Sequence, residues 1–185
     1  MKLQKTILMI LLLVFGFTAS ASATELAEDF TFKDIKGNTH KLSDFKGKWV
    51  LANYWGTYCS PCLEEIPDLI KFTDKHKKDV VVLGLETGGT DLKDLIEFAD
   101  DYDMNYIVAP VQESTINAFG ILMVIPTTYV ISPKGEVVDK ILGVVDLDSI
   151  ETQIALYNND NIKNNSPKKD DAPKKDEGPD GILDF

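Results

Sequence analysis

The chain contains two cysteines, Cys59 and Cys62, which lie in the stretch Trp-Gly-Thr-Tyr-Cys-Ser-Pro-Cys of residues 55–62. The apolar run 49–54 precedes this stretch, and apolar residues at helical spacing follow it in 63–70. Two cysteines three positions apart, between a strand and a helix, indicate a redox-active dithiol. The free N–H groups and positive dipole end of the helix would stabilise a thiolate, so the pKa of Cys59 should be lowered.

A static disulfide or half of a zinc site would also use two closely spaced cysteines. A zinc site needs about four ligands. Besides the two cysteines, the sequence offers only the scattered histidines His40 and His76, which we predict to be surface residues. We therefore expect redox chemistry at Cys59 and Cys62, with no metal and no cofactor.

Length and charge narrow the class of protein and its partners. The 185 residues suffice for one domain with a core, plus extensions. The net charge of −11 makes nucleic acid and anionic membrane surfaces poor partners. All 19 basic residues are lysine, so the bidentate clamping of phosphate that arginine provides is absent.

The N-terminal residues 1–23 have the features of a secretory signal peptide. Lys2 and Lys5 form a charged start, residues 7–17 are apolar, and Ala-Ser-Ala at 21–23 is a small-residue cleavage site. The apolar run is short for a membrane span, which needs about 20 residues. We predict cleavage after residue 23 and a periplasmic or other extracytoplasmic location, with an uncleaved membrane anchor as the alternative. A dithiol that stays reduced in such an oxidising compartment must receive electrons from a partner.

Hydrophobic periodicity predicts an α/β fold. The predicted strands are 30–33, 39–42, 49–54, 80–85, 106–109, 127–131 and 137–142. The predicted helices are 60–76, 91–102, 114–119 and 147–157. The continuous apolar run 80–85 is typical of a central parallel strand. This order predicts a central mixed sheet flanked by helices, with an N-terminal β-hairpin extension ahead of it.

The composition changes after the last predicted helix. Lysine, aspartate, proline and glycine dominate, and Pro-Lys-Lys-Asp at 167–170 recurs at 173–176. Such a segment cannot bury enough apolar surface to fold. We predict one domain over residues 24–158 and a disordered, charged tail over 159–185. The apolar residues at its end, up to Phe185, are either a docking peptide or a terminus without a role.

The cysteine motif resembles the active site of the thioredoxin superfamily, in particular Trp-Ala-x-Trp-Cys-x-Pro-Cys of its exported TlpA/ResA-like branch. Ile125-Pro126-Thr127-Thr128 is similar to the cis-proline loop of that family. The early hairpin, Pro67 and Glu65 also match, and the likeness covers about residues 28–158. The resemblance implies a thioredoxin-like fold and a thiol–disulfide oxidoreductase.

Three positions depart from the usual patterns. Gly56 and Tyr58 replace the common alanine and tryptophan, and both changes are mild. Asn53 stands where thioredoxin itself has a buried aspartate, although asparagine is usual in the TlpA-like branch. Because an asparagine cannot accept a proton, the best candidate for a buried base is Glu65, one helical turn after the second cysteine.

The predicted roles follow from position and resemblance together. Cys59, at the helix start, should be the more exposed thiol and attack a substrate disulfide, and Cys62 should then resolve the mixed disulfide. Glu65 would take the proton of Cys62. The resemblance implies a cis bond before Pro126, which would expose the backbone of Ile125 to an extended substrate. Trp55 and Tyr58 are predicted to line the same groove.

The resemblance also implies a direction of reaction and a set of partners. A proline before the second cysteine is associated with reductants in this superfamily, so Ser60-Pro61 favours reduction of protein disulfides. The electron donor would be a membrane thiol reductant of the DsbD or CcdA type. Apocytochrome c is the best-known substrate of the branch, which makes a role in cytochrome c maturation the analogous function. We expect a monomer.

Two rival functions remain open, and two others are disfavoured by the cysteine spacing. A disulfide oxidase or isomerase would use the same motif at a higher reduction potential. A peroxidase is disfavoured because the Thr-x-x-Cys turn is absent, and a copper carrier of the Sco type uses Cys-x-x-x-Cys. A binding module that docks through the tail is the remaining alternative.

Overall fold

The computed structural model describes residues 25–120, 122 and 124–165. It divides into two units, one ending at Val145 and the other starting at Asp146, and each is described by itself. The first unit contains a mixed sheet and most of the helices, and the second contains α5 (Leu147–Asn165). The predicted signal peptide, and the predicted tail from residue 166 on, lie outside the described residues. No helix within the described ranges is long and apolar enough to cross a membrane.

The sheet of the first unit has six strands in the order β1-β8-β7-β4-β5-β6. Their bounds are β1 Glu25–Leu26, β4 Trp49–Trp55, β5 Val80–Glu86, β6 Ile107–Pro110, β7 Thr127–Ile131 and β8 Glu136–Leu142. Parallel pairing joins β4 to β5 and β5 to β6, and the other pairs are antiparallel. The predicted fold class, a thioredoxin-like mixed sheet flanked by helices, is confirmed.

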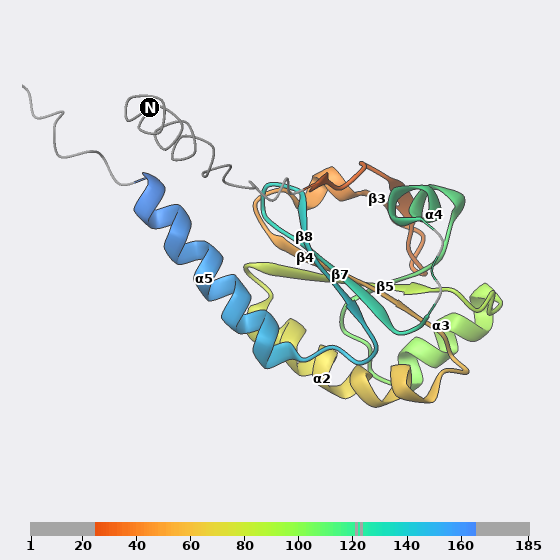
Figure 1. Ribbon diagram of the computed structural model, residues 1–185. Helices are drawn as coiled ribbons and strands as arrows, with labels where there is room; N and C mark the ends of the chain where they lie inside the picture. Colours follow the sequence, from red (N-terminus) through yellow and green to blue (C-terminus); the bar gives the residue numbers. More distant parts are fainter. Residues whose placement is uncertain (1–24, 121, 123, 166–185) are drawn as a thin grey trace, which may run out of the picture. The chain divides into compact units, whose positions relative to one another are not determined.

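Helices and a small hairpin cover the two faces of this sheet. Figure 1 shows α2 (Ser60–His76) and α3 (Leu92–Asp101) on one face. The other face is covered by α4 (Glu113–Phe119) and by the hairpin of β2 (Thr31–Lys33) and β3 (Thr39–Lys41). The predicted N-terminal hairpin extension is therefore confirmed as a separate two-stranded sheet. A short turn of 3₁₀ helix, η1 (Leu42–Phe45), follows β3.

Strand β4 lies in the middle of the sheet, and all seven of its residues are buried. Successive side chains of a strand point to opposite faces. Tyr54 packs in the core beneath the hairpin with Phe30 and Phe32. Asn53 and Trp55 point the other way, towards α2 and α3. The strand therefore places the polar side chain of Asn53 on the α2 side, near its C-terminal end.

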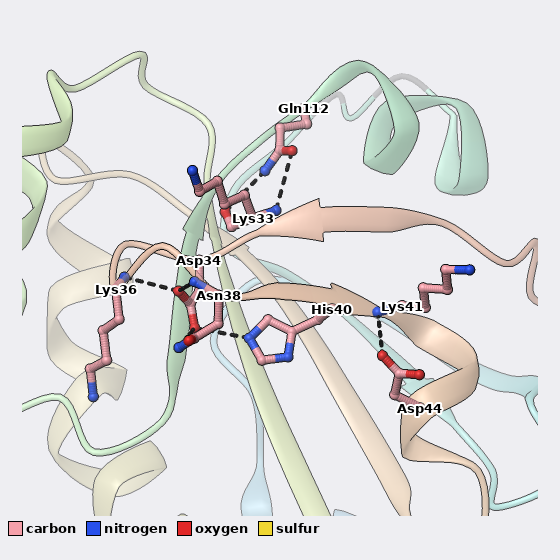
Figure 2. Close-up of polar contacts among 8 residues, drawn as sticks. All are labelled: Lys33, Asp34, Lys36, Asn38, His40, Lys41, Asp44 and Gln112. Carbon is pink, nitrogen blue, oxygen red and sulfur yellow. Dashed lines mark hydrogen bonds and ion pairs between the residues drawn. The ribbon is translucent and has the colours of Figure 1, made fainter.

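The hairpin is tied to the rest of the unit by α4. Gln112, the residue before this helix, donates from Nε2 to the carbonyl of Lys33 at 3.1 Å, and its Oε1 accepts the Lys33 N–H at 3.3 Å (Figure 2). Ser114 donates to the carbonyl of Thr31 at 2.6 Å. These bonds satisfy backbone groups of β2 that have no partner strand on that side.

Asp34 closes the turn between β2 and β3, and its side chain is buried (Figure 2). Its carboxylate accepts hydrogen bonds from the N–H groups of Lys36 and Asn38, from the Asn38 amide, and from Nε2 of His40 at 2.9 Å. His40 was predicted to be a surface residue, but its ring stacks between Phe32 and Phe45 and is only partly exposed. Burial alone would raise the pKa of Asp34, but the bonds from His40 and Asn38 outweigh burial and lower it.

Asp34→Asn should destabilise the fold at pH 7 by about 1–3 kcal/mol, because the amide nitrogen that replaces Oδ2 cannot accept the bonds from Nε2 of His40 and the side-chain amide of Asn38. Because the pKa of Asp34 is lower in the folded state, its ionised carboxylate stabilises the fold at pH values above its ordinary pKa of 3.8. This stabilisation is lost as the pH falls through the folded pKa. The difference between variant and wild type should therefore shrink below pH 3.8. Urea unfolding across pH measures it. Asp44→Asn is the matched control, since exposed Asp44 accepts only the Lys41 N–H in Figure 2 and should show a clearly smaller change.

Two boundaries differ from the prediction. Strand β1 precedes the first predicted strand, and it pairs with β8 through Glu25 and Val137. The predicted end of the last helix at residue 157, and with it the start of the tail at 159, is wrong because α5 continues to Asn165. Extending a helix adds one hydrogen bond for each residue fixed, so a helix can outlast its apolar periodicity.

Candidate active site

Cys59 and Cys62 form a disulfide at the start of α2, with their Cα atoms 5.2 Å apart. Cys59 is the N-terminal capping residue, and its carbonyl accepts the N–H groups of Cys62 and Leu63 at 2.9 and 3.1 Å. Cys59 retains 8% of its accessible surface and Cys62 none. The more accessible sulfur is therefore that of Cys59, which also lies where the free N–H groups of the helix would stabilise its thiolate.

The cis-proline loop lies directly beside Cys59. The peptide bond between Ile125 and Pro126 is cis, as the resemblance implies. Strand β7 begins at the next residue and pairs with the end of β4, so that Thr127 lies opposite Tyr54. This register places the carbonyl oxygen of Ile125 3.8 Å from Sγ of Cys59. No hydrogen bond joins these two atoms in the disulfide form, since the sulfur has no proton.

Glu65 is a buried carboxylate on α2, one turn beyond Cys62, and is 3% exposed. Its Oε1 accepts from the amide of Asn53 at 2.7 Å, and its Oε2 accepts the N–H of Val145 at 3.1 Å. Asn53 donates its second hydrogen to Oγ1 of Thr128 at 3.1 Å. The side-chain amide of Asn53 thus gives one hydrogen to Glu65 and the other to Thr128.

The pKa of Glu65 is raised from its ordinary value of 4.5. Burial is the main cause, and the hydrogen bonds from Val145 and Asn53 oppose it only in part. Glu65 and Cys62 are both buried residues of α2. A carboxylate with a raised pKa can accept a proton in such an interior, where no water molecule is available to do so. Two donors therefore hold this buried carboxylate in place, the amide of Asn53 on β4 and the N–H of Val145 in the segment after β8.

Trp55 and Tyr58 have different environments. Tyr58 is 70% exposed, so its ring lies at the surface next to Cys59 in the chain. Trp55 is 2% exposed, and its ring packs against Phe98 of α3 with 5.5 Å between centroids. The prediction that Trp55 lines the groove is therefore corrected. As the last residue of β4, it points to the buried helical face of the sheet.

Several groups at the site were given no role of their own in the sequence analysis. Thr128 and the backbone of Val145 complete the surroundings of Glu65, but both are far from it in the chain. Glu86, at the end of β5, is 1% exposed and lies in register with Trp55. The sequence did contain a signal for Glu86, because a glutamate at the end of an apolar strand, directly before Thr-Gly-Gly-Thr, is a polar group where a buried one is unexpected. Within the described ranges, no cluster of three or more metal-ligating side chains occurs.

Comparison with known proteins agrees with this geometry. The model of the AhpC/TSA family matches residues 23–140. The thiol-disulfide oxidoreductase ResA of Geobacillus kaustophilus is 32% identical over 163 residues, which cover 82% of this chain and 92% of that protein.

Two solved structures are also similar. The first is a thiol:disulfide interchange protein of the thioredoxin family from Chlorobium tepidum. It matches with a TM-score of 0.68 and 22% identity, over 74% of this chain and 98% of that one. The second is an exposed lipoprotein thioredoxin of Streptococcus pneumoniae. It matches with a TM-score of 0.61 and 26% identity, over 70% and 99% of the two chains.

Proposed function

The chain belongs to the AhpC/TSA family and is a thioredoxin-like thiol–disulfide oxidoreductase, and from this premise we propose that it is exported and reduces disulfides in protein substrates. The observation that supports this most directly is the position of Cys59. Its sulfur is the accessible one of the pair, and it lies beside the carbonyl of Ile125, a backbone group that an extended peptide can pair with.

The surface around the disulfide favours a polypeptide substrate. Four exposed apolar side chains surround the cis-proline loop and the motif: Tyr58, Val124, Leu142 and Val144. The N–H of Gly143 donates to the carbonyl of Pro126 at 2.8 Å, which holds the segment after β8 against this loop. Exposed apolar side chains near a reactive group are typical of a protein interaction site.

The proposed reaction transfers two electrons in two exchanges. The Cys59 thiolate attacks one sulfur of the substrate disulfide, which forms a mixed disulfide and releases one substrate thiol. Glu65 accepts the proton of Cys62, and the Cys62 thiolate then attacks Cys59. The second substrate thiol leaves, and the protein is left with the Cys59–Cys62 disulfide. Pro126, Ile125 and Tyr58 would hold the substrate during both steps.

The proposal of export rests on the signal-like residues 1–23, and the proposal of an electron donor rests in turn on export. An extracytoplasmic reductant needs a supply of electrons, for which a membrane thiol reductant of the DsbD or CcdA type is the proposed partner. The likeness to an exposed lipoprotein thioredoxin supports a location outside the cytoplasm. A role in cytochrome c maturation is the proposed physiological use, and we expect the protein to act as a monomer.

The reduction potential tests the direction of the reaction. We expect a value close to the roughly −270 mV of thioredoxin, because Pro61 removes an N–H that could stabilise the Cys59 thiolate. Equilibration of the purified protein with glutathione or dithiothreitol mixtures, followed by alkylation of the free thiols, measures it. A potential at or above about −180 mV would instead indicate an oxidase or isomerase.

A further inference from the structure

Glu86 is a buried carboxylate that the exchange reaction does not use. It ends β5 beside Trp55, the last residue of β4, so it lies next to the start of the cysteine motif. The N–H of Thr87 and its hydroxyl both donate to the carbonyl of Trp55, at 2.8 and 3.1 Å. The loop that follows Glu86 therefore runs alongside the motif loop from its first residue.

The Glu86 carboxylate organises this loop. Its Oε1 accepts the N–H of Gly88 at 2.7 Å and the hydroxyl of Thr90 at 3.1 Å, and its Oε2 accepts the Thr90 N–H at 3.3 Å. Gly89 has a φ of +70°, a conformation that favours glycine and lets the chain turn back to the carboxylate. One buried side chain thus binds three hydrogen-bond donors of the following loop, the Gly88 N–H and the N–H and hydroxyl of Thr90.

A chain of hydroxyl groups connects the carboxylate to the motif. Oγ1 of Thr90 lies 3.1 Å from Oγ1 of Thr57, two residues before Cys59. The Thr90 hydroxyl gives its hydrogen to Glu86, because a carboxylate oxygen only accepts. Thr57 must then donate to Thr90, so the direction of the chain is Thr57 to Thr90 to Glu86.

The same loop supports the ring of Tyr58. A methyl group at Gly88 would lie 2.5 Å from Cε1 of Tyr58 and 2.5 Å from Oε1 of Glu86, so the ring lies directly over this glycine. A methyl group at Gly56 would lie 3.0 Å from the same Tyr58 atom. The exposed ring next to the nucleophile therefore rests on two glycines, one of which is held by Glu86.

We propose that Glu86 is a positioning residue for substrate binding, which acts through Thr90 and Thr57 and keeps Tyr58 in place beside Cys59. The proposal rests on Tyr58 being part of the substrate-binding surface in the proposed function. An ordered aromatic ring loses little entropy when a peptide packs on it, and a mobile ring loses more. Loss of the Glu86 connection should therefore weaken the reaction with peptides and spare the reaction with small disulfides.

Thr90→Val tests this proposal, since valine keeps the shape of threonine and removes the hydroxyl between Thr57 and Glu86. The reduced protein is mixed with either bis(2-hydroxyethyl) disulfide or a short unfolded peptide that has one internal disulfide. Second-order rates are followed by quenching with an alkylating reagent and mass spectrometry. We expect the peptide rate to fall by about fivefold to tenfold, the effect of losing one anchoring contact, and the small-disulfide rate to stay within about twofold.

Three companion variants make the result specific. Thr87→Val is the matched control in the same loop, since Thr87 donates to Trp55 and not to Glu86, and both of its rates should match wild type. Thr90→Ser keeps the hydroxyl and should restore the peptide rate. Gly88→Ala would place a methyl group 2.5 Å from both the Tyr58 ring and Oε1 of Glu86, and it should reproduce the selective loss.

Each remaining outcome would overturn the proposal. Unchanged peptide rates in Thr90→Val would show that the connection does not position Tyr58. Equal losses with both probes, or the same loss in Thr87→Val, would show a general structural defect. Far-ultraviolet circular dichroism and urea unfolding of each variant check the fold. If wild type reacts with neither probe, the proposed function fails, and this inference fails with it.

Discussion

Cys59→Ser should abolish disulfide exchange, with a loss on the order of a thousandfold or more, as is usual when an attacking nucleophile is removed. The remaining sulfur, that of Cys62, has no accessible surface and cannot meet a substrate disulfide. The measurement is the rate at which the reduced variant opens an oxidised peptide, followed by alkylation and mass spectrometry.

Cys62→Ser should give the opposite behaviour and trap the substrate. Cys59 can still attack from the start of α2, but no second thiol is present to release the mixed disulfide. Incubation with an oxidised peptide should therefore accumulate a covalent adduct that dithiothreitol reverses. Rapid turnover by Cys59→Ser, or the absence of any adduct with Cys62→Ser, would contradict the assignment of attacker and resolver.

Glu65→Gln should slow the resolving step at neutral pH by about a hundredfold, which is the lower end of what a positioned general base contributes. Above its raised pKa, Glu65 is ionised and can accept the proton of Cys62, and below that pKa it cannot. The wild-type rate of resolution should therefore rise with pH through the pKa of Glu65. The variant should lack this rise and become faster only as Cys62 itself ionises.

Glu64→Gln is the matched control for this experiment, because Glu64 is the neighbouring residue and is exposed. Its pH profile should follow wild type. Asn53→Asp is the complementary variant, since it places a second carboxylate where Asn53 now lies, 2.7 Å from Oε1 of Glu65. Two carboxylates at this distance cannot both ionise easily, so the rise in rate should move to higher pH. Unaltered pH profiles in both Glu65→Gln and Asn53→Asp would exclude Glu65 as the proton acceptor.

The same carboxylate should make stability depend on pH. Because its folded pKa is raised, Glu65 favours the folded state fully below 4.5, and this contribution is lost as pH rises through the folded pKa. Glutamine does not ionise, so Glu65→Gln does not lose stability in this way. As the pH rises from 4.5 through the folded pKa of Glu65, the free energy of unfolding of the variant should therefore increase relative to that of wild type. Urea unfolding of the two oxidised proteins at a series of pH values measures the difference.

The fold was largely predictable because its signals are local. The apolar run of β5 and the helical spacing in α2 each depend on a few consecutive residues, and both elements lie where predicted within a residue. The end of α5 was mispredicted because a helix can continue over polar residues without an apolar face. Trp55 was misplaced because an aromatic residue beside a motif fits a groove and a core equally well in sequence.

The sequence by itself determined the kind of chemistry and where in the chain it occurs. The spacing of Cys59 and Cys62 and their place ahead of a helix are properties of neighbouring residues, as is the proline at 126. Only the tertiary structure decided what surrounds these groups. The register of β4 against β7 brings Ile125 to Cys59, and the packing of α2 against the sheet brings Glu65 to Asn53.

The connection from Glu86 to Thr57 has the same origin. Glu86 reaches the motif because β4 and β5 end at the same level of a parallel sheet, although about thirty residues of chain separate them. Hydrophobic periodicity shows that these segments are strands, but it carries no information about which atoms meet at their ends. Those contacts depend on strand register and on the exclusion of water between distant segments, which arise only when the whole sheet has formed.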